Sequence, residues 1–379
     1  MGPLEGLRVV EIASVGPGPF AAMVLADLGA EVIRIDRPGG SSDLPMFPGL
    51  DLLNRGRRSA AIDLKHPDGV TTVLRLVEQA DVLIEGFRPG VAERLGIGPE
   101  VCHTRNPGLV YGRMTGWGQD GPAADTAGHD IDFIAVAGAL EPLGDPDRPP
   151  PSPINFIGDF GGGAMLLAFG IMAALWEKER SGKGQVVDAA MVDGAALITT
   201  MLHSHRAMGL WQDARGANLL DGAAPFYRTY QTADGRYVAV GALEPKFYAA
   251  LLAGLGLADD DLPPQYDRDQ WPELERRFDE AFRQRTRDEW AESFAGTDAC
   301  VAPVLAPHEA SGHPHLAARG TFIEVDGVLQ PAPAPRFDRT PGGVSAPPPL
   351  PGAHTTGVLA DWGFGPEDIE ALRSGGAIA

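Results

Sequence analysis

The stretch that decides the fold is LRVVEIASVGPGPFAAMVLADLGAEVIRI, residues 7–35 of a 379-residue chain. A β-branched run from Leu7 to Ile12 is followed by a turn of glycines and prolines, Gly16 to Pro19, which predicts a strand that ends in a tight turn. The next residues have the apolar spacing of a helix, and Glu31 to Ile35 is a second apolar run. The stretch therefore predicts a βαβ unit.

A second unit of the same kind follows. SAAIDLKHPDG (59–69) leads into a helical pattern over Gly69 to Gln79 and then into the strand-like run ADVLIEGF (80–87). A further strand is expected at Gly108 to Arg113. Because strands that alternate with helices form parallel sheets, we expect an α/β, Rossmann-like domain with its ligand crevice at the carboxyl ends of the strands.

The remaining sequence predicts a second, smaller lobe. A proline-rich loop, Pro146 to Pro153, precedes a long helical pattern over Gly161 to Glu179. SGKGQVVD (181–188) then leads into another helical stretch through Met208, and Asp234-Gly235 between apolar runs predicts a hairpin. Helices with alternating charge are expected from Glu273 to Phe294. We therefore expect a large domain over residues 1–200 completed by 330–379, a linker over 201–224 and an α+β domain over 225–329.

The net charge excludes several classes of partner. Lys and Arg total 31 against 51 Asp and Glu, a formal charge of -20, which repels nucleic acids and anionic membranes.

The two cysteines, Cys102 and Cys300, cannot form a disulfide framework, so we expect the reducing cytoplasm. The first residues lack the pattern of a signal peptide, no apolar run reaches 18 residues, and no histidine spacing indicates a metal site.

A group of cations falls at or just past the predicted strand ends, where a parallel sheet brings them to one edge. A cluster of this kind in an acidic chain suits phosphate groups, although ordinary solvated surface is an equal alternative. Its members are Arg34, Arg37, Arg55, Arg57, Arg58, Lys65, Arg88 and Arg94. The turn VGPGPFAA (15–22) lacks the third glycine of a dinucleotide loop, which disfavours a nicotinamide cofactor.

Two polar residues stand beside glycine-rich helix starts. His129 lies in GHDIDF (128–133), just before an expected helix, and Asp159 lies in IGDFGGG (157–163). Each has an ordinary explanation, a capped or core histidine and an N-cap aspartate. Glycines that open a helix also allow a ligand to approach the backbone N–H groups.

At these motifs the sequence resembles the α-methylacyl-CoA racemases, within the family III CoA-transferase superfamily. The resemblance covers essentially the whole chain. It implies an interlocked homodimer whose active site combines the large domain of one chain with the small domain of the other. It is carried by the opening stretch and by LIEGFRPGVAERLG (83–96), RMTGWGQDGP (113–122), AGHDIDF (127–133), NFIGDFGGG (155–163), SGKGQVVDAAMVDG (181–194) and GALEPKFYAALLAGLG (241–256).

The resemblance also implies residue roles. His129 and Asp159 would be the acid/base pair, with Glu244 supplied by the partner's small domain. CoA, which is part of the substrate and not a cofactor, would bind at Arg37, Ile62, Asp63, Leu64, Lys65, Gly86, Phe87, Arg88 and Arg94, and the reacting end at Gly128, Asp130, Ile131, Asp132 and Phe133. Many members have Asn where this chain has Asp132. The extra carboxylate of Asp132 either raises the pKa of His129 or faces away from the imidazole.

The implied reaction is epimerisation of (2R)- and (2S)-2-methylacyl-CoA by two-base 1,1-proton transfer through an enolate, an isomerase activity of fatty-acid and lipid metabolism. An N–H donor beside His129, that of Asp130, is expected to bind the thioester oxygen. The alternative within the fold is a CoA-transferase with Asp159 as nucleophile, and a non-enzymatic alternative is an acyl-CoA-binding scaffold. Met191, Met201 and Met208 form either a flexible wall for the acyl chain or core packing.

Overall fold

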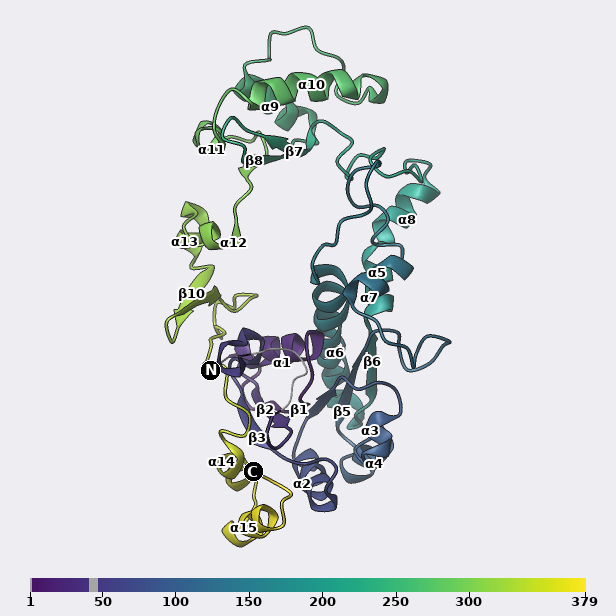
Figure 1. The fold of residues 1–379 in the computed structure, drawn as a ribbon, viewed down its shortest axis with the longest axis vertical. Coiled ribbons are helices and arrows are strands. Elements are labelled where there is room, and N and C mark those ends of the chain that lie inside the picture. The colour runs from purple at the N-terminus through teal and green to yellow at the C-terminus, as the bar shows by residue number, and fades with distance from the viewer. Residues whose placement is uncertain (1, 41–46) are drawn as a thin grey trace. The chain divides into compact units, whose positions relative to one another are not determined.

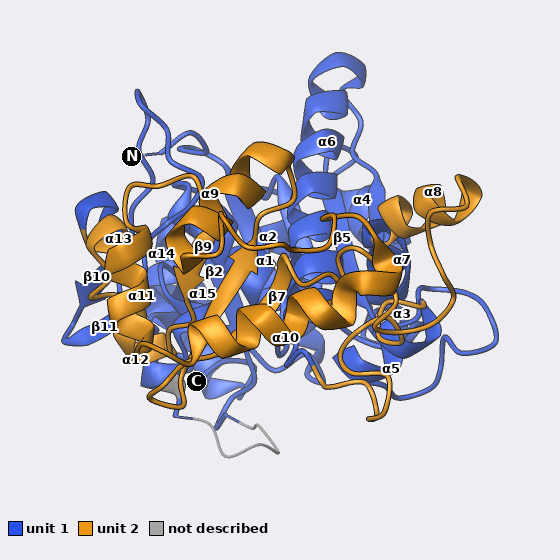
Figure 2. Ribbon diagram, turned by 90° about the horizontal axis from the view of Figure 1, so that it is seen from above, with its two compact units in different colours: residues 1–137, 153–198, 318–379 blue, residues 138–152, 199–317 orange. Residues whose placement is uncertain are grey.

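A computed structural model describes residues 2–40 and 47–379. By its contacts the chain divides into two compact units (Figure 2). Unit 1 comprises residues 1–137, 153–198 and 318–379, and unit 2 comprises 138–152 and 199–317. Unit 2 thus holds residues 225–317 of the expected small domain together with the expected linker and one earlier segment.

Unit 1 is built on a six-stranded parallel sheet, which confirms the expected fold class (Figure 1). The strand order is β3-β2-β1-β4-β5-β6, so β1 pairs with β2 on one side and with β4 on the other. The chain reverses its direction of winding between β1 and β4, and in open α/β sheets ligands bind outside the strand ends at that point. The strands are β1 (Arg8–Ile12), β2 (Glu31–Asp36), β3 (Arg58–Ala61), β4 (Val82–Glu85), β5 (Val110–Thr115) and β6 (Val186–Ala190).

The two faces of the sheet bury two separate cores, because neighbouring side chains on a strand point to opposite faces. Val10 packs with Leu74 of α2 and Trp362 near the C-terminus, whereas Val9 packs with Leu25 of α1 and Leu167 of α6. The helices of unit 1 are α1 (Pro17–Asp27), α2 (Pro67–Val77), α3 (Val91–Arg94), α4 (Pro99–Arg105), α5 (Asp130–Val136), α6 (Met165–Ser181), α7 (Met191–Ile198), α14 (Thr355–Asp361) and α15 (Pro366–Ser374), with short 3₁₀ turns η1 (Pro48–Leu50) and η2 (Leu52–Asn54).

The C-terminal segment completes unit 1 beside β3. Thr355 Oγ1 accepts a hydrogen bond from the N–H of Ala61, and Ile378 forms an antiparallel bridge with Ile62. Residues 331–352, which are rich in proline, contain no helix and only the end of a strand. The hairpin of β10 (Phe322–Val325) and β11 (Val328–Pro331) precedes them.

Unit 2 contains a three-stranded sheet of β7 (Tyr227–Gln231), β8 (Tyr237–Gly241) and β9 (Val301–Pro303). The expected hairpin at Asp234-Gly235 is confirmed, with Gln231 opposite Tyr237 and Gly235 at a φ of +75°. Aromatic side chains form much of its core. Its helices are α8 (Thr200–Ala207), α9 (Pro245–Leu255), η4 (Arg268–Gln270), α10 (Trp271–Phe282), α11 (Arg287–Phe294) and α12 (Pro307–Ala310), and α13 (Pro314–Arg319) crosses the boundary at residue 318.

One strand was not predicted, and the start of one helix was predicted wrongly. SGKGQVVD (181–188) leads into the helices α7 and α8 as expected. Residues 186–190 first form the edge strand β6, because Val186 and Val187 pair with Tyr111 and Gly112 of β5. The helix expected from Gly161 begins earlier, as the π-helix η3 (Phe156–Ala164), and runs directly into α6. Asp159 consequently lies inside this π-helix and is not an N-cap. π-Helical turns within α-helices are rare and are frequent at functional sites.

Candidate active site

A cavity of about 750 Å³ lies in unit 1 where β1, β2, β3 and β4 end. This is the sheet edge at which the sequence predicted a ligand crevice, and it includes the point where the winding direction reverses. The cavity is lined by Ile12, Ala13, Ser14, Val15, Arg34, Ile35, Asp36, Arg37, Gly40, Asp51, Asn54, Ile62, Asp63, Leu64, Lys65, Phe87, Val91, Leu95, Pro349 and Pro351.

Most of the residues expected to bind CoA gather at this cavity. Six of them line it: Arg37, Ile62, Asp63, Leu64, Lys65 and Phe87. Gly86 lies behind the wall, since a Cβ placed on it would lie 3.1 Å from the Ser14 Cβ. Arg88 follows Phe87, and Arg94 lies between the lining residues Val91 and Leu95 without lining the cavity itself.

The expected cation cluster is half structural. The ion pairs join Arg34 to Glu11 and Asp36, Arg55 to Asp27, Arg57 to Glu11, and Arg58 to Glu31 and Asp361. Arg57 and Glu11 are fully buried at 2.7 Å, and a buried guanidinium requires such a carboxylate. The expectation that these cations lie at or past the carboxyl ends of strands was wrong for this half, because Arg55, Arg57 and Arg58 lie before or at the start of β3. Arg34 lies inside β2, and all four side chains hold strands and loops together.

The charge at the cavity also differs from the expectation of a strongly cationic crevice. Its lining holds Arg34, Arg37 and Lys65, but also Asp36, Asp51 and Asp63. The lining is therefore balanced in formal charge, within a chain whose total is -20. Lys65 and Arg88 make no ion pair with any residue that the structure describes, which leaves both available to an anion.

The turn after β1 links the cavity to Asp159. Val15 lines the cavity, and a Cβ placed on the next residue, Gly16, would lie 3.3 Å from Asp159 Oδ2. Gly16 has a φ of +71°, which other residues rarely adopt, and Pro17 and Pro19 remove two N–H groups from the start of α1. This turn is therefore poorly equipped to bind phosphate and well shaped to let a carboxylate approach.

Asp159 occupies a half-buried position in η3. The Asn155 side-chain amide donates a hydrogen bond to its Oδ2 at 3.1 Å. Burial raises the pKa of Asp159, the Asn155 hydrogen bond opposes that rise, the charge of Asp130 adds to it and His129 lowers it. The carboxyl thus keeps its proton to a higher pH than an exposed aspartate does.

His129 is the N-cap residue of α5, and its imidazole is close enough to Asp159 for their charges to interact. It is exposed in the single chain. Its backbone N–H donates to Oδ2 of Asp132 at 2.9 Å, so the carboxylate at this position binds the backbone of the same turn. Asp132 therefore has a local structural role at the helix start.

Asp130 connects α5 to η3. Its Oδ2 accepts hydrogen bonds from the N–H groups of Gly158 at 2.6 Å and Asp159 at 2.7 Å. Its own N–H, and that of Ile131, find no acceptor among residues 2–40 and 47–379. Two donors that point out of the helix start therefore lie beside His129.

Gly128 and Phe133 pack together on the buried side of this turn. Phe133 is buried and packs edge-on against Trp117, with ring centroids 4.9 Å apart. A Cβ placed on Gly128 would lie 2.7 Å from the Phe133 ring. Both residues, expected at the reacting end, thus shape the start of α5 from its protein-facing side, whereas Ile131 is exposed.

Two neighbours of Asp159, Gly16 and Asn155, were not predicted from the sequence. Asn155 begins the quoted motif NFIGDFGGG, and its distance of four residues from Asp159 was the available signal. Of the three methionines, Met191 is buried in the core of unit 1, which favours packing for that residue. Met201 and Met208 are exposed and belong to unit 2.

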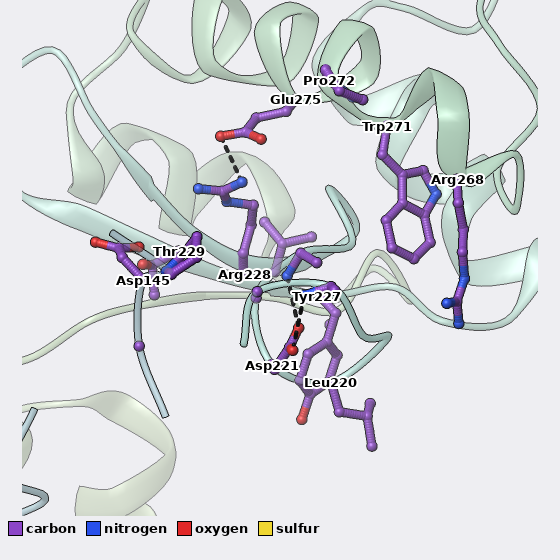
Figure 3. A pocket seen from close by; sticks show the side chains of 18 of the residues that line it. Asp145, Leu220, Asp221, Tyr227, Arg228, Thr229, Arg268, Trp271, Pro272 and Glu275 are labelled. Atoms are coloured by element: carbon purple, nitrogen blue, oxygen red, sulfur yellow. Dashed lines mark hydrogen bonds and ion pairs between the residues drawn. The ribbon is translucent and has the colours of Figure 1, made fainter. Parts of the chain in front are cut away.

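Unit 2 has a cavity of its own, of about 1080 Å³ (Figure 3). Arg228 forms an ion pair with Glu275 at its wall, and Arg268 lies over the ring of Trp271. None of the residues expected at the active site lines this cavity. Glu244 is the exposed N-cap residue of α9 in unit 2.

No group of three or more His, Cys, Asp or Glu side chains suited to a metal ion occurs in the described part of the chain. The polar groups around Asp159 are amides, carboxylates and one imidazole. Their arrangement suits proton transfer and the hydrogen bonding of an oxyanion.

The chain is similar to proteins of known name along nearly its whole length. It is 48% identical over 374 residues to alpha-methylacyl-CoA racemase of Mus musculus and 46% identical over 373 residues to that of Homo sapiens, covering 98% of this chain and 96% of each enzyme. A crystal structure of a CAIB/BAIF family protein from Brucella suis superposes with a TM-score of 0.83 at 28% identity, covering 95% of this chain and 99% of that one. A model of CoA-transferase family III matches residues 4–355. The chain therefore belongs to CoA-transferase family III.

Proposed function

We propose that the chain is a racemase that interconverts the (2R) and (2S) epimers of 2-methylacyl-CoA thioesters. The observation that carries the proposal is that His129 and Asp159, two groups able to exchange protons, are near enough for their charges to interact, and that Asp159 lies beside the turn that follows the cavity residue Val15. The two mammalian enzymes that are 48% and 46% identical to this chain are both named alpha-methylacyl-CoA racemase.

Inversion at the α-carbon requires two acid/base groups, because the proton leaves one face and must return to the other. One group starts as the base while the other starts protonated. The raised pKa of Asp159 brings its proton affinity toward that of an imidazole. With the substrate between them, His129 and Asp159 exchange these roles between the two directions of the reaction.

Proton transfer alone is not sufficient. If the pKa of the α-carbon lies on the order of ten units above that of the protonated base, removal of the α-proton would cost ~14 kcal/mol. The enolate that forms must therefore be stabilised. The unpaired N–H groups of Asp130 and Ile131 beside His129 supply hydrogen bonds to the thioester oxygen as it gains charge. A thioester substrate suits this chemistry, and the proposal uses no further cofactor.

The CoA part is proposed to occupy the cavity at the strand ends. Lys65 and Arg88 offer cations that no described carboxylate neutralises, and Phe87 offers an aromatic face at the wall. Val15 lines this cavity, and the next residue, Gly16, lies beside the carboxylate of Asp159. A thioester that extends along this path reaches the acid/base pair.

A second copy of the chain is proposed to cover one face of α6 and to supply Glu244. Met165, Phe169, Met172 and Trp176 lie on one side of the helix and are all exposed, Trp176 by 70%. The segment Phe156–Ser181 is long and apolar enough to cross a membrane by length and composition alone, and its other side packs on β5 and β6. A protein partner explains the same apolar face. Light scattering that gave a monomer at assay concentration would contradict this part.

The test is racemisation of a single-epimer 2-methylacyl-CoA in deuterated water. Wild-type protein should exchange the α-proton and racemise from either epimer. His129→Ala should retain exchange with one epimer only, and Asp159→Ala with the other, since each keeps one base. His315→Ala and Asp338→Ala, exposed residues of the same types, should behave like wild type.

Two results would overturn the proposal. Unchanged exchange in both variants would remove the assigned roles of His129 and Asp159. A covalent adduct on Asp159, trapped with hydroxylamine or borohydride during turnover with an acyl acceptor, would instead indicate CoA transfer with Asp159 as nucleophile.

A further inference from the structure

We infer that the Asp130 side chain is a positioning residue that couples the two acid/base elements of the site. Its carboxylate fixes the turn that carries Asp159, while its backbone forms the first residue of the helix capped by His129. The inference rests on the proposed function for its kinetic consequences but not for its structural ones. It gives the Asp130 carboxylate a role distinct from that of the Asp130 N–H.

The geometry is specific to this pair of segments. Asp130 is 4% exposed, and a single oxygen, Oδ2, receives both N–H groups, from Gly158 and Asp159. A Cβ placed on Gly158 would lie 2.8 Å from the same oxygen and 3.0 Å from the carboxyl carbon. The close approach therefore requires glycine at 158, so two positions of the sequence serve one contact.

The rest of the carboxylate is not used elsewhere in the described chain. Its other oxygen, Oδ1, is buried without a hydrogen-bond partner, and no Lys, Arg or His among the described residues forms an ion pair with Asp130. A buried carboxylate held by only two N–H groups is costly, and such groups call for an explanation beyond packing. Its negative charge acts on the nearest titratable group of η3, which is Asp159.

The surroundings of Asp159 contain few charges to compete with Asp130. Asp130 and His129, both from the start of α5, are the charged groups that act on it, and its own segment offers the Asn155 amide. The N-cap residue of α1, Gly16, is uncharged, and α7 packs on η3 through the backbone of Gly194. The Asp130 charge raises the Asp159 pKa, which helps the carboxyl to hold the proton that one direction of the reaction needs.

The test compares Asp130→Asn with Asp130→Ala. The asparagine keeps an acceptor oxygen for both N–H groups but removes the charge, whereas alanine removes both. Asp193→Asn, an exposed aspartate in the first turn of α7, is the matched control. We expect kcat of racemisation to fall at least about 100-fold in Asp130→Ala with KM changed less than about threefold, and asparagine to recover at least about tenfold of that loss.

The readout that a purely structural role would not move is the titration of Asp159. Carbon-13 NMR of aspartate-labelled protein, with the Asp159 signal assigned from Asp159→Asn, should show a lower Asp159 pKa in Asp130→Asn than in wild type, because a like charge has been removed. The acid limb of the kcat profile that reports Asp159 should move to lower pH as well. The Asp159 titration should be unchanged in Asp193→Asn.

The inference and the proposed function fail in different ways. If wild-type protein exchanges no α-proton, the racemase proposal fails, and the Asp159 titration still decides the role of Asp130. If wild-type protein racemises but Asp130→Asn leaves the Asp159 pKa unchanged, the coupling is overturned. If Asp130→Ala does not fold, Gly158→Ala takes its place, because the added methyl group would push the Asp130 carboxylate away from the turn of Asp159. A normal kcat in that variant would equally overturn the positioning role of Asp130.

Discussion

At one end of the site in unit 1, His129 and Asp159 are placed by backbone hydrogen bonds and by glycines that permit close approach, whereas at the other end the cavity is lined by charged side chains. At the first end, the Asp130 carboxylate accepts hydrogen bonds from two backbone N–H groups and the Asp132 carboxylate accepts one from a third. Gly16 and Gly158 have no Cβ and so let the carboxylates of Asp159 and Asp130 approach closely. The second uses ion pairs around β1, β2 and β3, together with Lys65, which has no ion pair among the described residues. The acid/base end therefore depends mainly on the precise placement of its groups, and the cavity depends mainly on charged side chains.

Because of this difference, we expect substitutions at the acid/base end to change the rate and substitutions at the cavity to change the affinity for substrate. An error of 1 Å at an acid/base group changes the barrier, because reacting atoms must align. A lost cation at the cavity changes binding in both ground and transition states, which raises KM and leaves kcat unchanged. Substitutions at the two ends should therefore separate kinetically.

The largest effect is expected for Asp159→Asn. It keeps the size of the side chain and removes the proton exchange, so kcat should fall about 10³- to 10⁴-fold. The dissociation constant for CoA, measured by calorimetry, should stay within about threefold of wild type, because the cavity is formed by other residues. A parallel loss of CoA affinity would show that the two ends are not separable.

The next effect concerns stability and the cations that resemble ligands. Glu11 is fully buried between Arg34 and Arg57, and Glu11→Ala would leave Arg57 without its carboxylate. We expect a loss of about 3–5 kcal/mol in the free energy of unfolding, measured by urea denaturation at fixed protein concentration. Glu78→Ala, which breaks the exposed pair with Arg105, should cost less than about 1 kcal/mol. Equal costs for the two variants would argue against a structural role for the Arg57 cluster.

Much of the fold followed from local patterns, and the site followed only in part. The βαβ unit of residues 7–35, the hairpin at Gly235 and the loop around Pro146 were predicted because short-range spacing and turn residues determine them. The family resemblance pointed to His129 and Asp159. The π-helix around Asp159 was not predicted, since glycines after an aspartate also suit an ordinary helix start.

Contacts between distant segments could not be predicted from either source. Arg57 reaches Glu11 across 46 residues, and Asp130 reaches Gly158 across 28, so their partners depend on how strands and helices pack. Strand β6 was missed for the same reason, because its pairing with β5 crosses a long connection. Charge at a strand end was visible in the sequence, but whether it faces a ligand or a carboxylate was not.

A smaller effect is expected from Glu85, the fully buried last residue of β4, whose carboxylate accepts a hydrogen bond from the N–H of the cavity residue Phe87. Burial raises the pKa of Glu85 to about 7, although the Phe87 N–H and Arg113 act in the opposite direction. Because the folded protein binds this proton more tightly than the unfolded chain, the stabilisation is full below about pH 4.5 and is lost as the pH rises through about 7. The free energy of unfolding should fall by up to about 3 kcal/mol over that window.

The measurement is urea denaturation from pH 5 to pH 8 for wild type, Glu85→Gln and Glu93→Gln. Glu85→Gln should reduce the change in the free energy of unfolding between pH 5 and pH 8, because glutamine does not titrate. For Glu93 the sign is opposite, because the hydrogen bond from Arg113 lowers its pKa despite partial burial, so its contribution is lost only as the pH falls below the usual glutamate range. Identical slopes in wild type and Glu85→Gln would contradict the assignment.

The smallest effect is expected at Lys65, which has no ion pair among the described residues and lines the cavity next to Asp63. Lys65→Ala should weaken CoA binding about five- to tenfold, the size of one charge-assisted hydrogen bond, while kcat stays within about twofold. Raising the salt concentration should narrow the difference between the variant and wild type, because the lost interaction is screened. Lys183→Ala, an exposed lysine before β6, should leave both constants unchanged. If Lys65→Ala lowered kcat and left KM intact, charge at the cavity would be acting on the reaction itself, and the kinetic separation of the two ends would fail.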